Sequence, residues 1–214
     1  MYVAVTVGSE NYGSLGDNFV QEGLAYRITP FNTNKSGLRI DSERMYDNLM
    51  NKFRYGGLDN PDFYVDETIM RMCNTHRRLF GQLVKQLLAE GKKDKARKLL
   101  EKAETAIPAY TVPHTYVSGS VDLAEAWTSL GEKKKAEEIL LPLLRNVKQY
   151  TDWYLGQSDA RFQSNVEECR YYLIQFNAAI EALEATGSKQ YAMYEKAFQN
   201  AYMAWGARAG YGEE

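Results

Sequence analysis

The 214-residue sequence has only two cysteines, Cys73 and Cys169, and only two histidines. The cysteines lie far apart and have no partners at metal-ligand spacing, so the sequence indicates neither a zinc site nor a disulfide framework. We expect both thiols to be free and buried, with one long-range disulfide as the alternative. The sequence also predicts no metal and no cofactor.

An excess of charge of one sign and long apolar runs are missing as well. The 26 basic and 28 acidic residues leave a net charge of -2, which argues against nucleic acid as a partner. No run of about 18 apolar residues occurs, and the first residues lack the basic and apolar regions of a signal peptide. The chain as written is therefore predicted to be soluble.

Few groups of residues in the sequence match a phosphate-binding, metal-binding or catalytic site. Three glycines between Gly8 and Gly16 invite a phosphate-loop interpretation, but no Lys-Ser or Lys-Thr follows Gly16, and Asp17 would repel a phosphate. Cys73 and His76 lie three residues apart on a predicted helix, yet no second pair of ligands follows. Because no nucleophile, base and orienting residue form a set, we predict a chain without catalytic residues.

Aromatic residues, in contrast, are plentiful, with 16 Tyr, 8 Phe and 3 Trp. Aromatic side chains are large amphipathic contact groups that are enriched at interfaces. We expect most of them to line seams between helices and the others to belong to binding surfaces.

The N-terminal residues 1–60 are predicted to form a small α/β cap with a sheet of two or three strands. Residues Tyr2–Val7 have the pattern of a short buried strand. Asp17 is a suitable N-cap for a short helix that carries Phe19 and Val20.

The rest of this cap is predicted to contain a hairpin and a helix. Residues 24–28 look extended, and residues 38–40 are expected to pair back as a hairpin across the polar turn 32–37. A helix then begins at Asp41 or Ser42 and ends before Gly56.

Residues 61–214 are predicted to be a helical repeat region. Asp66 is a suitable cap for its first helix, which shows an apolar stripe at helical spacing. The predicted helices cover residues 66–90, 93–106, 117–130, 133–149, 160–186 and 189–206.

A repeated pattern unites four of these helices. Six positions recur at the same spacing in two stretches: Leu83, Leu87, Gly91, Ala96, Leu100 and Ala103, then Leu123, Trp127, Gly131, Ala136, Leu140 and Leu143. Glycine allows the left-handed backbone that ends the first helix, and the small alanine lets two helix backbones approach closely. The pattern resembles the tetratricopeptide repeat, whose unit has about 34 residues.

A third, weaker pair follows with Ile180, Leu183, Gly187, Ala192 and Tyr202. We therefore predict a mainly α fold: a tetratricopeptide-like superhelix of antiparallel helix pairs with a small N-terminal α/β cap.

Four segments together resemble one family: Tyr2–Val7, Glu22–Pro30, Met45–Leu58 and the Asp66-Glu67 pair that precedes the repeats. They are similar to the C-terminal soluble region of large bacterial multi-pass membrane proteins of unknown function, which are distantly related to protein O-mannosyltransferases. The resemblance implies a tail beside a membrane glycosyltransferase-like protein, on the periplasmic face of the inner membrane. The parent's membrane part is not in this sequence, so no catalytic residue is carried over.

The function expected from these observations is a non-catalytic interaction module that binds a protein or peptide partner or an acceptor, with a glycan as the other ligand considered. The partner is expected on a concave surface formed by the first helix of each pair. The candidate partner-binding residues are Arg71, Arg78, Gln82, Gln86, Asp122 and Trp127.

The alternative prediction is a carbohydrate-binding module. Exposed Tyr and Trp rings would serve as stacking platforms for sugars. The candidates are Tyr150, Trp153, Tyr154 and Trp205.

Overall fold

The computed structural model describes residues 1–31 and 39–210, and its chain divides into two compact units. The N-terminal unit comprises residues 1–113 and 117–122, and the C-terminal unit comprises residues 114–116 and 123–214. The predicted boundary near residue 60 therefore falls inside the N-terminal unit.

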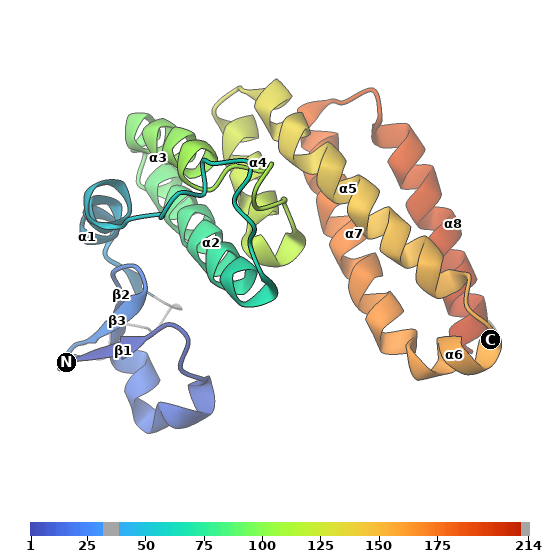
Figure 1. The fold of residues 1–214 in the computed structure, drawn as a ribbon, viewed down its shortest axis with the longest axis horizontal. Coiled ribbons are helices and arrows are strands. Elements are labelled where there is room, and N and C mark those ends of the chain that lie inside the picture. Colours follow the sequence, from blue (N-terminus) through green and yellow to red (C-terminus); the bar gives the residue numbers. More distant parts are fainter. Residues whose placement is uncertain (32–38, 211–214) are drawn as a thin grey trace. The chain divides into compact units, whose positions relative to one another are not determined.

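The N-terminal unit begins with a four-stranded sheet (Figure 1) in the order β1-β3-β2-β4. Strand β3 (Ala25–Ile28) pairs antiparallel with both β1 (Tyr2–Ala4) and β2 (Phe19–Gln21), whereas β4 (Arg39–Ile40) pairs parallel with β2. Two short 3-10 helices, η1 (Ser9–Asn11) and η2 (Gly13–Asn18), connect β1 to β2.

Four predictions for this sheet were wrong, the first being its size, since it has four strands where two or three were expected. Residues Phe19–Gln21 form strand β2 and not a helix capped by Asp17, because their β-branched and aromatic side chains pair with β3 and are buried. Strand β1 is largely exposed instead of buried. Residues Arg39–Ile40 pair in parallel with β2 and so do not close a hairpin, and the predicted turn 32–37 lies outside the described residues.

The helices of this unit begin with α1 (Ser42–Asp47), which Asp41 caps by accepting a hydrogen bond from the Arg44 amide. It continues as a π-helical turn, η3 (Asn48–Lys52). Then follow α2 (Glu67–Ala89), capped by Asp66 as predicted, and α3 (Lys93–Ala106), which packs against α2. The apolar seam between α2 and α3 consists of Phe80, Leu83, Val84, Leu87, Ala96, Leu99, Leu100 and Ala103.

A buried arginine fastens the segment after α3 to α2. The Arg77 guanidinium is 1% exposed and donates hydrogen bonds to the carbonyl oxygens of Ile107 (2.9 Å), Val112 (2.5 Å) and Pro113 (2.9 Å). Burial lowers the pKa of Arg77 to about 10, which is still well above neutral, so the guanidinium carries its charge at pH 7. Its hydrogen bonds supply donors to loop carbonyl groups that would otherwise lack a hydrogen-bond partner.

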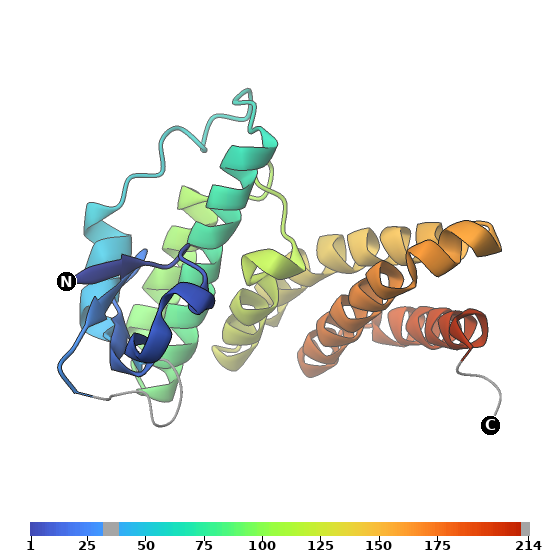
Figure 2. The same cartoon turned by 90° about the horizontal axis from the view of Figure 1, so that it is seen from below.

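The C-terminal unit contains α5 (Lys133–Leu155), α6 (Asp159–Ser164), α7 (Val166–Thr186) and α8 (Tyr191–Ala209). Figures 1 and 2 show α5, α7 and α8 packed together as a three-helix bundle. The 3-10 turn η4 (Tyr116–Ser118) precedes α4 (Ser120–Ser129), and the boundary between the units falls inside α4.

The two repeats end their first helices in the same way. Gly91 (φ 74°) and Gly131 (φ 84°) both adopt left-handed conformations, and the amide that follows each glycine donates to the carbonyl five residues earlier. These bonds run from Lys92 to Leu87 (2.8 Å) and from Glu132 to Trp127 (2.9 Å). Gly187 (φ 73°) ends α7 before α8.

The mainly α fold is thus confirmed, and each of the three predicted helix pairs is present as helix, turn and helix. The superhelical arrangement of the pairs stays a prediction. Two helix boundaries differ: α5 continues through Pro142 to Leu155, and the expected helix 160–186 breaks at Asn165 into α6 and α7. Both cysteines are free and buried, as expected.

Candidate functional site

The polar residues predicted to bind a partner lie along α2 and at the start of α4, but most already have intramolecular partners. Arg71 pairs with Glu67, Gln86 donates to Glu90 (2.7 Å), and Asp122 accepts from Lys85 (2.6 Å). Arg78 is exposed.

The face of α2 that was expected to receive a partner is partly covered by the chain's own sheet. The buried Gln21 of β2 donates its side-chain amide to Gln82 of α2 at 3.0 Å. The sequence pattern shows only that Gln82 is polar and gives no sign of this contact. Part of this face is therefore an internal contact of the N-terminal unit.

Trp127 is not a surface residue, contrary to the prediction. Its side chain is fully buried, and the Lys135 ammonium lies 4.1 Å from the ring centroid. Because the first helix of a pair presents its large apolar residue to the seam, Trp127 belongs to the core and is inaccessible to a ligand.

A buried carboxylate next to the sheet forms an ion cluster. Glu22 accepts from the Arg27 side chain at 2.5 Å and lies 3.4 Å from an Arg44 nitrogen. Burial acts to raise the pKa of Glu22, but the Arg27 hydrogen bond and the Arg44 charge outweigh it, so the pKa is lower than usual. A carboxylate held ionised by two arginines is suited to tying β2 and β3 to α1 and is a poor general acid.

The Cys73–His76 pair also lacks the geometry of a reactive site. His76 lies edge-on to the rings of Phe53 (5.8 Å) and Tyr55 (5.7 Å). Burial raises the pKa of Cys73 and lowers the pKa of His76, so thiol and imidazole are both held in their neutral forms. In the described part of the chain, no three His, Cys, Asp or Glu side chains are grouped so that they could hold a metal ion.

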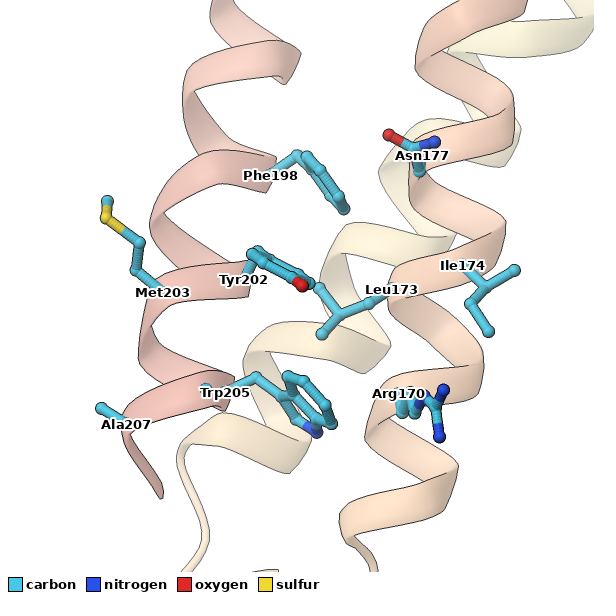
Figure 3. Close-up of a pocket in the computed structure, with 10 residues that line it drawn as sticks. Arg170, Leu173, Ile174, Asn177, Phe198, Tyr202, Met203, Trp205 and Ala207 are labelled. Atoms are coloured by element: carbon cyan, nitrogen blue, oxygen red, sulfur yellow. The ribbon is translucent and has the colours of Figure 1, made fainter. Parts of the chain in front are cut away.

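The C-terminal unit contains an open groove of about 860 Å³ between α7 and α8. Figure 3 shows the rings of Phe198, Tyr202 and Trp205 projecting from α8 toward α7, with Leu173 facing them from α7. Ile174 and Met203 point outward on the two flanks of the groove. The groove is thus lined by apolar side chains from both helices.

The three rings on α8 form a ladder at i, i+4 and i+7. Phe198 and Tyr202 stack at 5.9 Å between centroids, and Tyr202 and Trp205 follow at 6.0 Å. Trp205 is only 6% exposed, and its indole N–H donates to the Val166 carbonyl at 3.2 Å. It forms the floor of the groove, while Tyr202, at 54% exposed, stands at the surface.

One end of the groove is fixed by Arg208, near the C-terminus of α8. The guanidinium donates to the carbonyl oxygens of Leu155 (2.6 Å) and Gln157 (2.9 Å) and pairs with Asp159 (2.7 Å). It also lies 4.2 Å from the centroid of the buried Phe162 ring. The α5–α6 connection is thereby tied to α8.

Among the described residues that line the groove, the charged one is Arg170 of α7, which lies 3.5 Å from Glu167 in an exposed ion pair. Asn177 is the other polar side chain shown along the α7 wall in Figure 3. Such a surface is suited to hydrophobic contacts and has one cationic side chain at its edge. Its described side chains include no group that would act as a nucleophile or a base.

The residues of the carbohydrate alternative do not all lie on one surface. Trp205 is buried under the groove, so its prediction as an exposed stacking platform was wrong: its indole ring packs between α7 and α8. Tyr150, Trp153 and Tyr154 lie on α5, and Tyr150 and Trp153 are exposed.

Apart from Trp205, which was assigned to a sugar-binding surface, sequence reasoning missed the groove residues on α7 and α8. The spacing of Phe198, Tyr202 and Trp205 carried a signal, because positions i, i+4 and i+7 share one helix face. That signal was obscured because α8 also carries apolar Met193 and Met203 at exposed positions, so no single apolar stripe stands out.

Comparisons with known proteins give no family assignment: no family model matches the sequence, and the searches of curated proteins and of solved structures found no match. Within residues 1–31 and 39–210, none of the helices is both long and apolar enough to cross a membrane.

Proposed function

We propose that this chain is a non-catalytic helical interaction module that binds an amphipathic helical segment of a protein partner in the α7–α8 groove. The observation that carries the proposal is the groove itself, an open apolar channel between two adjacent helices with a ladder of three rings along α8. Helix-in-groove recognition uses this kind of surface.

The groove matches the apolar face of a helix in its chemistry. A partner helix presents apolar residues at i, i+3 or i+4 and i+7, and the α8 rings repeat at the same spacing. Tyr202 supplies a large, rigid contact area at the surface, and aromatic residues of this kind are common hot spots. Arg170 at the edge favours a partner with an acidic residue beside its apolar face.

The cellular setting belongs to the same proposal. The resemblance carried by Glu22–Pro30 and Met45–Leu58 supports a module attached to a bacterial membrane glycosyltransferase-like protein, on the periplasmic side of the inner membrane. The genomic reading frame upstream of Tyr2 tests this part: encoded membrane spans would support it, and a frame without them would contradict it.

Site-specific photo-crosslinking tests the groove. A photoreactive amino acid at Met203, which flanks the groove and is 64% exposed, should crosslink to one protein segment in cells. The matched control is the same amino acid at Met193, on the same helix and 57% exposed but not in the groove lining. Mapping of the crosslinked peptide identifies the segment.

The mapped segment is then synthesised and titrated against the purified chain by calorimetry. Tyr202→Asp should weaken its binding by about tenfold or more, since a charge at the ring position opposes burial, whereas Met193→Asp should not. Equal crosslinking at both positions, a crosslinked segment without an apolar helix face, or unchanged affinity for Tyr202→Asp would each refute the proposal.

A further inference from the structure

A second aromatic surface lies on the α5–α7 side of the C-terminal unit, away from the groove lining. We call it the aromatic platform, and it consists of Tyr150, Trp153, Tyr154, Tyr171 and Tyr172. These residues come from two helices that the sequence separates by α6, and none of them lines the groove.

The rings of the platform form one continuous set. Tyr150 and Tyr172 stack with centroids 4.7 Å apart and planes only 12° apart. Tyr154 lies 5.7 Å from Tyr172, and Trp153 lies edge-on to Tyr154 at 4.8 Å. Each ring therefore limits the motion of its neighbour, which fixes the surface before any ligand arrives.

Three rings of this set are exposed, whereas Tyr154 and Tyr172 are half-buried and Tyr154 packs against the core of the unit. Trp153 is 60% exposed, and Tyr150 and Tyr171 are also exposed. Isolated apolar residues at a surface need no explanation, but a contiguous cluster of exposed aromatic rings indicates a binding surface. Bulky rings that pack on one another without being covered are suited to a ligand that stacks on them.

Four charged side chains close to the platform in sequence are paired with opposite charges, whereas Glu168 is not paired with any described residue. On α5, Lys148 and Asp152 form an ion pair of 2.5 Å on either side of Tyr150 in the sequence. On α7, Arg170 lies 3.5 Å from Glu167. Because the two pairs largely neutralise themselves, they offer little net attraction to a charged ligand, and the remaining carboxylate of Glu168 disfavours an anionic one.

Hydrogen-bonding groups at the platform remain open. Within the described residues, the hydroxyl groups of the four platform tyrosines make no hydrogen bond, and Glu168 has no hydrogen bond or ion pair. Burial raises the pKa of Tyr154, and the negative charge of Glu168 raises it further. Phenol hydroxyls and a carboxylate can together donate and accept hydrogen bonds with a ligand rich in hydroxyl groups.

We infer that the aromatic platform binds a neutral oligosaccharide of equatorially linked pyranose units, by stacking of sugar C–H faces on Trp153 and its neighbours. Aromatic faces carry partial negative charge and attract the weakly positive C–H groups of a sugar ring. A polyanion would meet the carboxylate of Glu168 unfavourably. The inference goes beyond the proposed function, because it uses residues that do not line the groove.

Calorimetric titration of the complete 214-residue chain tests this inference. The probes are cellohexaose, chitohexaose and β-1,4-linked mannohexaose, with a heparin hexasaccharide as the charged comparison. We expect saturable binding of at least one neutral probe, accompanied by a change in the fluorescence of Trp153, the most exposed of the three tryptophans.

Two variants assign the binding to a face. Trp153→Ala should weaken binding about tenfold or more, while Tyr202→Ala, which removes a ring of similar exposure in the groove, should leave it within about twofold. Both positions are exposed, and circular dichroism checks that each variant is folded. Binding of the peptide mapped by crosslinking should weaken in Tyr202→Ala and stay unchanged in Trp153→Ala. Failure of one proposal is therefore distinguishable from failure of the other.

Four results would overturn the inference: no binding of any neutral hexasaccharide, binding of heparin alone, equal affinity for Trp153→Ala and the unchanged chain, or loss of sugar binding in Tyr202→Ala. A protein captured through Trp153 in place of a sugar would likewise assign the platform to protein recognition.

Discussion

Replacement of Arg77 should destabilise the N-terminal unit strongly. Its guanidinium is buried and donates to the carbonyl oxygens of Ile107, Val112 and Pro113. In the described part of the chain it has no acidic partner, so these carbonyls are the groups that balance its charge. The substitution to test is Arg77→Ala, with Arg77→Lys as the variant that keeps the charge.

The magnitude follows from two opposing effects. A hydrogen bond from a charged donor contributes about 1.5–3 kcal/mol, so three of them contribute about 4.5–9 kcal/mol. Removal of the guanidinium from water costs several kcal/mol, which offsets part of this gain. Truncation also leaves buried carbonyl groups without donors. We therefore expect Arg77→Ala to lower the free energy of unfolding by about 3–5 kcal/mol, and Arg77→Lys by less.

Urea denaturation followed by circular dichroism measures this change, and hydrogen exchange of the amides in residues 107–113 locates it. Arg71→Ala is the matched control, because Arg71 lies on the same helix but makes only an exposed ion pair with Glu67; its effect should stay within about 0.5 kcal/mol. A loss below about 1 kcal/mol for Arg77→Ala would show that the carbonyl groups find water instead, and would refute this account of the loop.

Three further substitutions test the core and the sheet. Burial lowers the pKa of His76, so the imidazole of the unfolded chain binds a proton at a higher pH than that of the folded chain. The free energy of unfolding should therefore decrease as the pH falls below about 6.5. His76→Phe should remove most of this dependence in melting curves from about pH 5 to 8. Trp127→Ala should cost about 3–5 kcal/mol in urea denaturation because the ring is fully buried. Gly23→Ala should cost about 1–3 kcal/mol in the same assay, since φ is 131° and the new Cβ would lie 3.1 Å from Phe53.

The helix pairs were predictable because their signals are local. Gly91 and Gly131 end their helices with left-handed backbones, and the amides of Lys92 and Glu132 each donate to a carbonyl five residues back in the chain. Each of these features depends on a few neighbouring residues. The N-caps of α1 and α2 were predictable for the same reason.

The sheet and the binding surfaces were not predictable in the same way. Strand β2 owes its conformation to pairing with β3 and β4, and β4 comes well after β2 in the chain. The groove requires α7 and α8 to pack side by side as neighbours, and the platform requires rings of α5 to meet rings of α7. Such contacts between distant residues leave no periodic pattern in one segment.

The tie made by Arg208 has a consequence for the energetics of recognition. Because this side chain fastens α8 to the α5–α6 connection by three polar contacts, the α8 wall of the groove is held in place before a partner arrives. Most of the conformational entropy lost on binding is then lost by the incoming segment, and little of it by this chain. Segments that are already helical in isolation should therefore bind more tightly than flexible ones of the same composition, and a staple across one helical turn should improve affinity without any new contact.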